Sequence, residues 1–303
     1  MSAGLDLEPH RAFLRGIAYR MTGTVGDADD VVQEAFLRTL AKPPPDLTLP
    51  LRPWLVRVTM NIARDKLRRR RRRGYHGPWL PGVVDDDAVA DVATADVLDA
   101  EARYSRKESV TFAFLIALEA LTPVQRAVLL LRDVFEFSGR ETAEALGISD
   151  DNAKQVLSRA RKALQGYDAR RIDVSDEHAA KNDAVLQKLL FALATDDSAA
   201  VLAMLRDDVV GLTDGGPYRA AKVAIVGATR LAQMLKALTK HWPVGTFTAT
   251  TATINARPAV VLRSLDPQPD YAPLWVLSID LDDDGSISTL YSLGAPDKLT
   301  PLG

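Results

Sequence analysis

The spacing of apolar residues predicts three helices within the first 73 residues. The first covers residues 10–21, and a break rich in glycine and threonine follows it. The second covers residues 27–40, with Asp27 as the expected N-cap and a buried stripe of mainly small and apolar side chains. Another face of this helix mixes polar side chains with one leucine, and it comprises Asp30, Gln33, Glu34 and Leu37. Such a stripe is typical of a docking surface or of an ordinary solvated face.

The third predicted helix, residues 51–73, is apolar on one side and polar on the other. Its polar positions recur three or four residues apart and lead into six consecutive arginines, residues 68–73. The positions that stand out on this side are Arg57, Asn61, Asp65, Arg68 and Arg69. Arginine binds phosphate oxygens in a fork geometry, so this face predicts contact with a nucleic-acid backbone. A solvated charged helix end and a localisation signal are the alternatives.

Residues 109–165 predict four helices that end in a helix-turn-helix. Capping boxes begin at Thr122 and Ser138, Gly147 ends the third helix, and Ser149 caps the last one. A short helix, a glycine turn and a longer helix form the arrangement that places a recognition helix in the major groove of DNA. The exposed positions near the start of that helix are Asp151, Asn152, Lys154, Gln155, Ser158 and Arg159. A helical hairpin without a DNA role is the alternative.

Residues 173–303 predict an α+β domain. Helices begin at Ser175 and Asp197, and a strand and a further helix follow at 208–213 and 229–240. Four segments then alternate apolar and polar residues, at 246–254, 259–265, 274–281 and 286–293. Helices packed on a curled antiparallel sheet form a cone with a pocket. The expected fold class is therefore multidomain, with two all-α helical domains followed by an α+β cone-shaped domain; the expected boundaries are 1–74, a linker at 75–108, 109–167 and 173–303.

The linker has the Gly, Pro and Asp content of a tether, but residues 75–81 differ from the rest of it. Two aromatic residues and two prolines lie within these seven positions. This composition favours a segment that docks on a folded surface, with a turn that caps the preceding helix as the alternative.

Charge divides the chain in the same way. The net charge is +7 in residues 1–80, −6 in 81–105, +2 in 106–172 and −5 in 173–303, which indicates a front end that binds a polyanion. The absence of cysteine excludes disulfides and thiolate metal sites, and four scattered histidines do not suggest zinc, so we expect no cofactor. No apolar run reaches the roughly 18 residues of a membrane span, and no signal peptide is evident; we expect a cytoplasmic protein.

The segment DADDVVQEAFLR, the proline-rich loop after it and WLVRVTMNIARDKLRRRRR resemble the promoter-melting domain of bacterial sigma factors of the extracytoplasmic-function group. The resemblance implies that Asp30, Gln33 and Glu34, with Leu37 beside them, bind a coiled coil of the RNA polymerase largest subunit. It also implies that two further parts lie near the single-stranded −10 element, namely residues 42–51 and the face with Arg57, Asn61, Asp65, Arg68 and Arg69.

Residues 120–164 resemble the −35-binding domain of the same sigma factors, with Glu141, Ala143, Gly147 and the Ser-Arg-Ala-Arg run at 158–161 in family positions. The resemblance implies that the recognition helix described above binds the −35 element. The implied partners are RNA polymerase core, through the coiled coil and the flap, and promoter DNA. We expect no membrane partner and a monomeric free protein.

Residues 173–303 resemble the SnoaL-like polyketide-cyclase domain of the ketosteroid-isomerase superfold. Some sigma factors of this group carry such a domain as a built-in regulator, with three motifs that form interdomain contacts. Here the motifs are Trp79-Leu80-Pro81, Asp214-Gly215-Gly216 and Ala295-Pro296-Asp297-Lys298-Leu299. The chain departs from the expected pattern at three positions, which are Gly82, Pro217 and Ala295.

These observations predict a sigma factor that directs core polymerase to promoters and is regulated in cis by its C-terminal domain, with no enzymatic activity. An enzymatic tail would need a general base, for which Asp214, Tyr218 and His241 are the candidates. The alternative for the whole chain is a helix-turn-helix regulator whose C-terminal domain binds a ligand or acts as a cyclase or isomerase.

Overall fold

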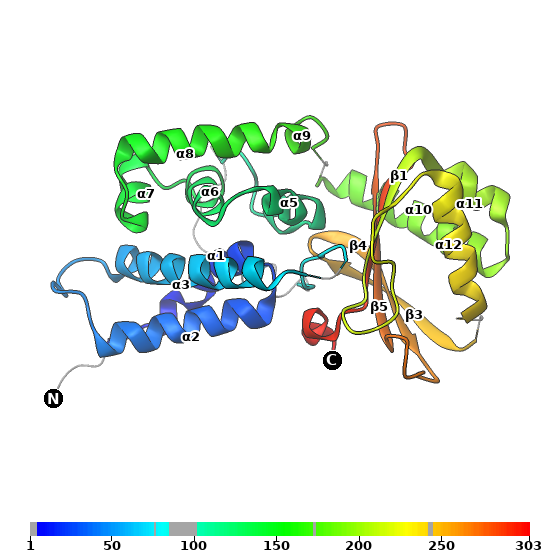
Figure 1. Cartoon of the computed structure of the whole chain (residues 1–303), viewed down its shortest axis with the longest axis horizontal. Coiled ribbons are helices and arrows are strands. Elements are labelled where there is room, and N and C mark those ends of the chain that lie inside the picture. The colour runs from blue at the N-terminus through cyan, green and yellow to red at the C-terminus, as the bar shows by residue number, and fades with distance from the viewer. Residues whose placement is uncertain (1–4, 76, 85–101, 172–173, 242–244) are drawn as a thin grey trace. The chain divides into compact units, whose positions relative to one another are not determined.

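The computed structural model describes residues 5–75, 77–84, 102–171, 174–241 and 245–303, without the side chains of Lys240 and His241. The chain divides into two compact units (Figure 1). The helical unit comprises Met1–Gly74 and Asp86–Arg171, and the sheet unit comprises Tyr75–Asp85 and Ile172–Gly303. The described parts of the predicted linker are thus divided, because residues 75–84 belong to the sheet unit and residues 102–108 to the helical unit.

The N-terminal half of the helical unit contains the three predicted helices, preceded by a 3-10 turn, η1 (Glu8–His10). They are α1 (Arg11–Thr22), α2 (Val25–Ala41) and α3 (Leu51–Arg73). The expected N-cap of α2 was wrong: Thr24 caps the helix, and its side chain accepts a hydrogen bond from the Asp27 backbone amide. Helix α2 therefore begins two residues earlier than predicted, and Asp27 lies in its first turn, where a carboxylate still complements the helix dipole.

The C-terminal half of the helical unit has the predicted caps. The capping boxes at Thr122 and Ser138 are both formed, Gly147 has a left-handed φ of 65°, and the Ser149 side chain accepts from the Asn152 amide. A π-helical turn, η4 (Leu130–Val134), extends α6. The elements are η2 (Glu108–Val110), α5 (Phe112–Ala117), η3 (Leu118–Ala120), α6 (Pro123–Leu129), η4, α7 (Gly139–Leu146), α8 (Asp150–Ala163) and α9 (Gln165–Asp168).

Two fully buried arginines join these halves of the helical unit. Arg126 donates to the Met21 carbonyl at 3.0 Å and to Glu119 Oε1 at 2.5 Å. Arg20 donates to Ser109 Oγ at 2.7 Å and to the Arg106 carbonyl at 3.0 Å. Because a guanidinium has five donors and no acceptor, each arginine can bind several carbonyls at a junction between helices.

The Glu119 carboxylate balances the charge at this junction. It accepts hydrogen bonds from both Arg126 and Arg70, each at 2.5 Å. Burial alone would raise the pKa of Glu119, but Arg126 and Arg70 outweigh it and hold the pKa below its ordinary value. Burial lowers the pKa of Arg126 to about 10, although Glu119 opposes that shift. The junction is therefore held by a charged network that was not predicted from the sequence.

The sheet unit packs helices against a six-stranded sheet. Its strands lie in the order β2-β1-β6-β5-β4-β3, and every neighbouring pair is antiparallel except β1 and β6. The four alternating segments form an antiparallel sheet as predicted, and β1, for which no partner was predicted, pairs parallel to β6. Its elements are α10 (Asp176–Ala194), α11 (Ser198–Met204), β1 (Leu205–Asp214), β2 (Ile225–Val226), α12 (Ala228–His241), β3 (Phe247–Ile254), β4 (Arg257–Ser264), β5 (Leu274–Leu281), β6 (Ile287–Leu293), η5 (Pro296–Lys298) and η6 (Thr300–Leu302).

Alternation along β1 and β6 gives the sheet two different faces. Val209 on β1 and Leu290 on β6 belong to the core against α10 and α12. Asp214 and Tyr291 occupy positions of the opposite parity, so their side chains lie on the other face. Strand β1 begins three residues earlier than predicted, because Leu205 already pairs with Ile287; the register then shifts between Leu205 and Val210, where Asp207 and Asp208 are exposed.

The junction of the helical unit yields a stability prediction. Glu119→Gln leaves Arg126 buried without a counter-charge, so we expect the unfolding free energy to fall by about 2–4 kcal/mol. This loss is smaller than that for a fully buried ion pair, because Glu119 is partly exposed. The measurement is urea unfolding followed by far-ultraviolet circular dichroism. Since the folded-state pKa of Glu119 is lowered, the stabilisation is present above the unfolded carboxyl pKa of about 4.3 and is lost as pH falls through the folded value.

The matched control is Glu144→Gln, which breaks an exposed pair with Arg140 on α7. It should change the unfolding free energy by less than about 0.5 kcal/mol. Equal losses in both variants would contradict a special role for the buried network.

Candidate nucleic-acid interface and linker site

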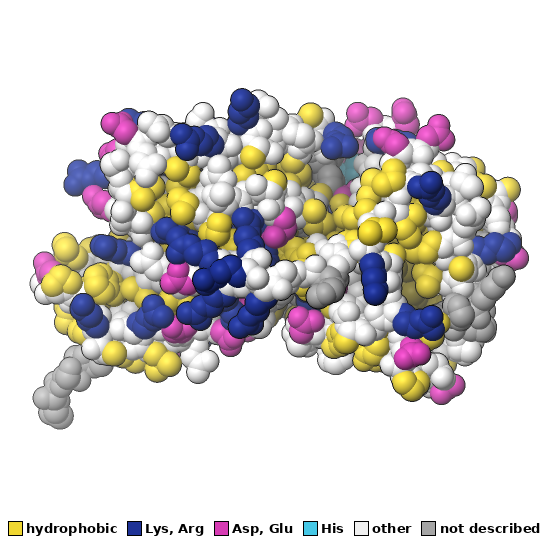
Figure 2. All heavy atoms as spheres, in the orientation of Figure 1, with side chains coloured by type: hydrophobic (Ala, Val, Ile, Leu, Met, Phe, Trp, Pro, Cys, Tyr) yellow, Lys and Arg dark blue, Asp and Glu magenta, His cyan; other side chains and the backbone are white. Residues whose placement is uncertain are grey.

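Helix α3 presents one exposed polar face. Arg57, Asn61, Asp65, Arg68 and Arg69 are all exposed, and the spacing of the first four places them along one side of the helix. The buried side is wider than the predicted stripe, since Val56, Met60 and Leu67 are also buried. Asp65 and Arg68 form an exposed ion pair at 2.7 Å. Figure 2 shows lysine and arginine side chains gathered over the C-terminal part of α3.

The six arginines at the end of α3 do not share one role. Arg70 donates to the Thr22 carbonyl at 2.6 Å as well as to Glu119, and Arg71 donates to the carbonyls of Glu119 and Leu121. These two side chains hold the helical unit together. An alanine series across residues 68–71 would therefore disturb the fold along with any phosphate contact, and Arg68 and Arg69 are the better probes of binding.

The predicted polymerase-binding stripe lies on the surface of α2. Asp30, Gln33, Glu34 and Leu37 are all exposed, and Leu37 retains 61% of its accessible surface. Lys66 of α3 binds Asp30 at 2.8 Å, and Arg38 binds Glu34 one turn away. An exposed leucine beside carboxylates that are held by neighbouring cations forms a small surface with a fixed charge pattern. The loop after α2 adds two more exposed leucines, Leu47 and Leu49.

The recognition helix α8 also exposes its predicted face. Its side chains Asp151, Asn152, Lys154, Gln155, Ser158 and Arg159 are all exposed, whereas Ala153, Leu157 and Ala160 are buried. Arg161, by contrast, binds the buried carboxylate of Asp133 at 2.6 Å. The face available for base edges and phosphates therefore does not include Arg161.

The most densely bonded polar site of the sheet unit is the carboxylate of Asp214. Lys298 Nζ donates to its Oδ2 at 2.6 Å, and the side chains of both residues are almost fully buried. The linker supplies two further donors, the Tyr75 hydroxyl at 2.6 Å and the Leu80 backbone amide at 2.9 Å. Lys298 Nζ also lies over the rings of Tyr75 and Trp79, at 4.3 and 4.9 Å from their centroids.

The linker continues along the sheet unit beyond this carboxylate. The Val83 amide donates to the Lys298 carbonyl at 2.9 Å. Val84 exchanges two hydrogen bonds with Asn255, donating to Oδ1 at 3.1 Å and accepting from the amide at 2.9 Å. Leu80, Pro81, Val83 and Val84 are buried. We call this set of contacts the linker site; it consists of residues 75 and 79–84, Asp214, Asn255 and Lys298.

Glycines allow the turn after Asp214 to pack closely. A Cβ on Gly215 would lie 2.7 Å from the Ala220 Cβ, and Gly216 has a left-handed φ of 56°. A Cβ on Gly216 would lie 3.1 Å from Ala295, which explains why a small residue suits position 295. The motifs Asp-Gly-Gly and Ala-Pro-Asp-Lys-Leu thus meet, because the Asp214 carbonyl accepts from the amides of Gly294 and Ala295.

Some expectations about this site differ from the structure. Pro296 and Asp297 are exposed in the 3-10 turn η5, whereas Lys298 of the same motif is buried and binds the Tyr75 hydroxyl of the linker. Val83, Val84 and Asn255 were missed. Asn255 lies in a two-residue hairpin with a φ of 54°, and asparagine is common in such turns, so the pattern indicated the turn but not its partner.

The described residues contain no group of acidic residues or histidines able to hold a metal ion, and no described helix is long and apolar enough to cross a membrane. Of the three candidate general bases, Asp214 is occupied by Lys298 and the linker. Tyr218 is partly exposed, and the His241 side chain lies outside the described residues.

Comparisons with known proteins find family matches for both halves of the helical unit. Residues 7–73 match the family model of sigma-70 region 2, and residues 112–164 match that of sigma-70 region 4. The chain is 33% identical over 97% of its length, and 92% of the relative's, to the ECF RNA polymerase sigma factor SigJ of Mycobacterium tuberculosis. This chain belongs to the extracytoplasmic-function family of RNA polymerase sigma factors. The family resemblance predicted from the sequence is confirmed, as is the expectation that the chain is not an enzyme.

The similarity of this ECF sigma factor to solved structures extends over the sheet unit. The crystal structure of M. tuberculosis SigJ matches with a TM-score of 0.73 and 30% identity, and the match covers 97% of each chain. A putative isomerase of the SnoaL-like family from Agrobacterium tumefaciens matches 38% of this chain and 97% of its own, with 16% identity and a TM-score of 0.28. The predicted fold class, helical sigma domains followed by an α+β domain, is confirmed.

The linker site of the ECF sigma factor yields a second prediction. Asp214→Asn removes the charge that neutralises buried Lys298, so the amides of Leu80 and Val83 should exchange with solvent at least about tenfold faster. The double variant Asp214→Leu with Lys298→Met removes both charges. Relative to Asp214→Asn, it should recover the stability of the sheet unit, but the Leu80 amide should still exchange fast because it has lost its acceptor. The measurement is hydrogen–deuterium exchange of linker peptides.

The control is Asp208→Asn, which breaks an exposed pair with Arg206 on the same strand. It should leave exchange of the linker amides unchanged. Unaltered exchange in Asp214→Asn would show that the linker is held by its apolar side chains alone.

Proposed function

We propose that this sigma factor is regulated in cis through the linker site, which limits how far its two promoter-binding parts can separate. The observation that carries the proposal is the bond network between residues 75–84 and the buried pair Asp214–Lys298. The carboxylate that defines the Asp-Gly-Gly motif is used to hold the linker and not a substrate.

The first step concerns the size of the helical unit. A compact unit of roughly 160 residues has a radius of gyration of about 15 Å and measures roughly 40 Å across. The −10 and −35 elements are named for positions about 25 base pairs apart, which is roughly 85 Å of duplex at about 3.4 Å per base pair. Helices α3 and α8 therefore need to move apart before both elements are bound, and the Arg20 and Arg126 junction has to open.

The second step concerns the reach of the chain that joins the two parts. Helix α3 ends at Arg73, and the chain enters the helical unit again before Tyr104, which is fully buried. The ten residues 75–84 could span at most roughly 33–36 Å if they were free. While Tyr75, Leu80, Val83 and Val84 are bonded to the sheet unit, the distance between the two ends of this segment is fixed, and the segment cannot extend further. Release of the linker would therefore favour the open, promoter-binding form.

The surfaces that act on partners are assigned in the same proposal. The exposed stripe of Asp30, Gln33, Glu34 and Leu37 would bind the coiled coil of the polymerase largest subunit, and region 4 would bind the flap. The exposed face of α3, with Arg57, Asn61, Asp65, Arg68 and Arg69, would bind the opened −10 element. The exposed face of α8 would read the −35 element. The free protein would be a cytoplasmic monomer.

Base capture gives this assignment an energetic basis. Opening duplex DNA costs about 1.4 kcal/mol per base-pair step on average, and stacking or pocketing an extruded base returns roughly 1–3 kcal/mol. The exposed leucines of the loop after α2, Leu47 and Leu49, and the polar face of α3 offer apolar and hydrogen-bonding surface for such bases. A few captured bases would offset the cost of melting.

The polymerase assignment is tested by Leu37→Ser. It removes an exposed apolar contact without disturbing the core, so we expect at least a tenfold loss in affinity for core polymerase, measured by competition with a labelled sigma factor. The control is Leu265→Ser, because Leu265 is equally exposed, at 62%, on the sheet unit. Core binding that is the same in both variants would place the polymerase contact elsewhere.

The regulatory role is tested by Tyr75→Phe and Trp79→Ala. Tyr75→Phe removes one hydrogen bond to Asp214 from a side chain that is 41% exposed, so the linker is loosened while the fold is kept. We expect both variants to raise transcription about twofold to tenfold from one mapped promoter, with purified core polymerase and sub-saturating sigma factor. The control is Tyr218→Phe, a tyrosine of the same unit outside the linker site. Unchanged output would contradict the regulatory role, and lower output would contradict its sign.

A further inference from the structure

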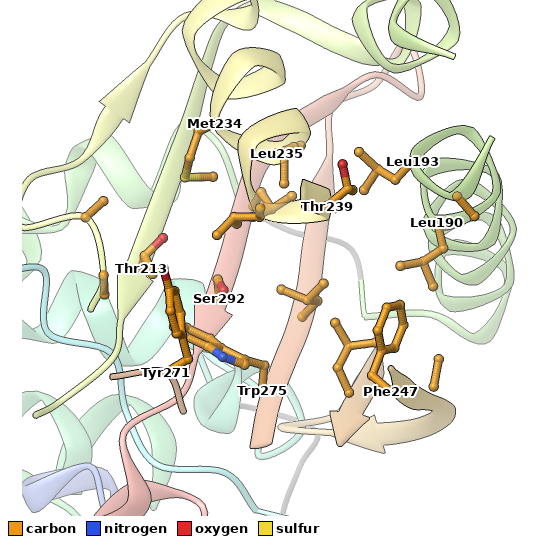
Figure 3. Close-up of a pocket in the computed structure, with 18 of the residues that line it drawn as sticks. Leu190, Leu193, Thr213, Met234, Leu235, Thr239, Phe247, Tyr271, Trp275 and Ser292 are labelled. Carbon is orange, nitrogen blue, oxygen red and sulfur yellow. The ribbon is translucent and has the colours of Figure 1, made fainter. Parts of the chain in front are cut away.

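A large cavity lies inside the sheet unit, on the face of the sheet opposite the linker site. It has a volume of about 950 Å³, within the range of sites that enclose drug-sized molecules. Its walls come from α10, α12 and the sheet. Figure 3 shows side chains from these elements directed toward a common space, among them Leu190, Met234, Phe247 and Trp275.

The described residues that line the interior of the cavity are uncharged. Of the residues that line it, Asp196 and Arg219 carry charge, and both are exposed at its margin. Asp196 is paired with Lys236 at 2.9 Å. Phe191 and Leu238 line the cavity and remain exposed, at 71% and 39%, which gives it an apolar entrance. An ionic ligand would lose hydration here without gaining a counter-charge, so the cavity suits a neutral molecule.

One polar feature interrupts the apolar wall. Thr213 on β1 and Ser292 on β6 are paired in register, so their hydroxyls lie side by side on the cavity face. Thr213 is 6% exposed, and its Oγ1 has no hydrogen-bond partner among the described residues. A buried hydroxyl without a partner is costly, and a ligand oxygen would satisfy it. Tyr271 and Trp275 supply aromatic surface to the same cavity (Figure 3).

We propose that this cavity binds a neutral, mainly apolar small molecule with a flat ring system and a carbonyl oxygen that accepts from Thr213. We propose further that ligand binding alters the linker site, a part that rests on the regulatory function proposed above. Among the described residues that line the cavity, no carboxylate is buried, and the features that they offer a ligand are apolar surface and the Thr213 hydroxyl.

The coupling has a short physical path. Thr213 and Asp214 are consecutive residues of β1, so one side chain faces the cavity and the other faces the linker. Trp275 lines the cavity and packs against the backbone that follows β6: a Cβ on Gly294 would lie 2.9 Å from three of its ring atoms. The Gly294 amide in turn donates to the Asp214 carbonyl at 2.7 Å. A ligand that shifts Trp275 therefore acts directly on the segment that positions Asp214 and Lys298.

Binding is tested with two neutral fluorescent probes, prodan, which has a naphthyl ketone, and N-phenylnaphthylamine, which has no carbonyl group. We expect both to bind the full-length protein saturably at one site. Thr213→Val should weaken prodan about threefold to tenfold and leave N-phenylnaphthylamine within about twofold. Leu277→Trp fills the cavity and should abolish binding of both probes, whereas Leu265→Trp, outside the cavity, should not.

Absence of saturable binding by either probe would overturn the cavity proposal. An equal effect of Thr213→Val on both probes would overturn the role of the hydroxyl. Because Thr213→Val conserves shape, this comparison remains decisive even where Leu277→Trp does not fold.

Coupling is tested by hydrogen–deuterium exchange of residues 79–84 with and without saturating prodan. We expect exchange of the Leu80 and Val83 amides to change at least about threefold, and Tyr75→Phe to change prodan affinity reciprocally. Probe binding without any change in linker exchange would overturn the coupling. The transcription comparison with Tyr75→Phe needs no probe, so failure of the regulatory function and failure of this inference give different results.

Discussion

The buried ion pair between Asp214 and Lys298 is the interaction on which the sheet unit's contact with the linker depends. Both side chains are removed from water, and the desolvation cost of such a pair is offset only when the remaining hydrogen-bonding positions are filled. Here the Tyr75 hydroxyl and the Leu80 amide fill them. The linker is therefore part of what makes the pair tolerable, and the pair in turn gives the linker a defined place. The ion pair and the position of the linker therefore depend on each other.

The helical unit follows a similar rule, but there the buried positive charges outnumber the buried negative ones. Two buried arginines need acceptors, and backbone carbonyls at the ends of helices together with Glu119 provide them. The arginine run of α3 is divided for this reason: Arg70 and Arg71 serve the junction, while Arg68 and Arg69 remain exposed. One basic segment thus combines a structural role with a surface suited to nucleic acid, and each arginine's role is set by which acceptors lie within its reach.

The sheet separates two sites that share a strand. Period-two alternation directs Thr213 toward the cavity and Asp214 toward the linker, so the two surfaces are one residue apart in sequence. The close packing of Trp275 on Gly294 leaves little room for either surface to change alone. On the linker side, the polar side chains of Asp214 and Lys298 are bonded to the chain segment that the sheet unit holds.

Local patterns determined the helices, most caps, the exposed faces of α2, α3 and α8 and the family, because amphipathic spacing and capping are properties of neighbouring residues. The motifs around Trp79, Asp214 and Lys298 were also evident in the sequence. The tertiary structure alone decided that Asn255 binds Val84, that Arg70 and Arg71 are structural, that Pro296 and Asp297 are exposed and that β1 pairs parallel to β6. These contacts join residues tens to hundreds of positions apart, and the burial that selects them is a property of the packed fold and not of any local segment.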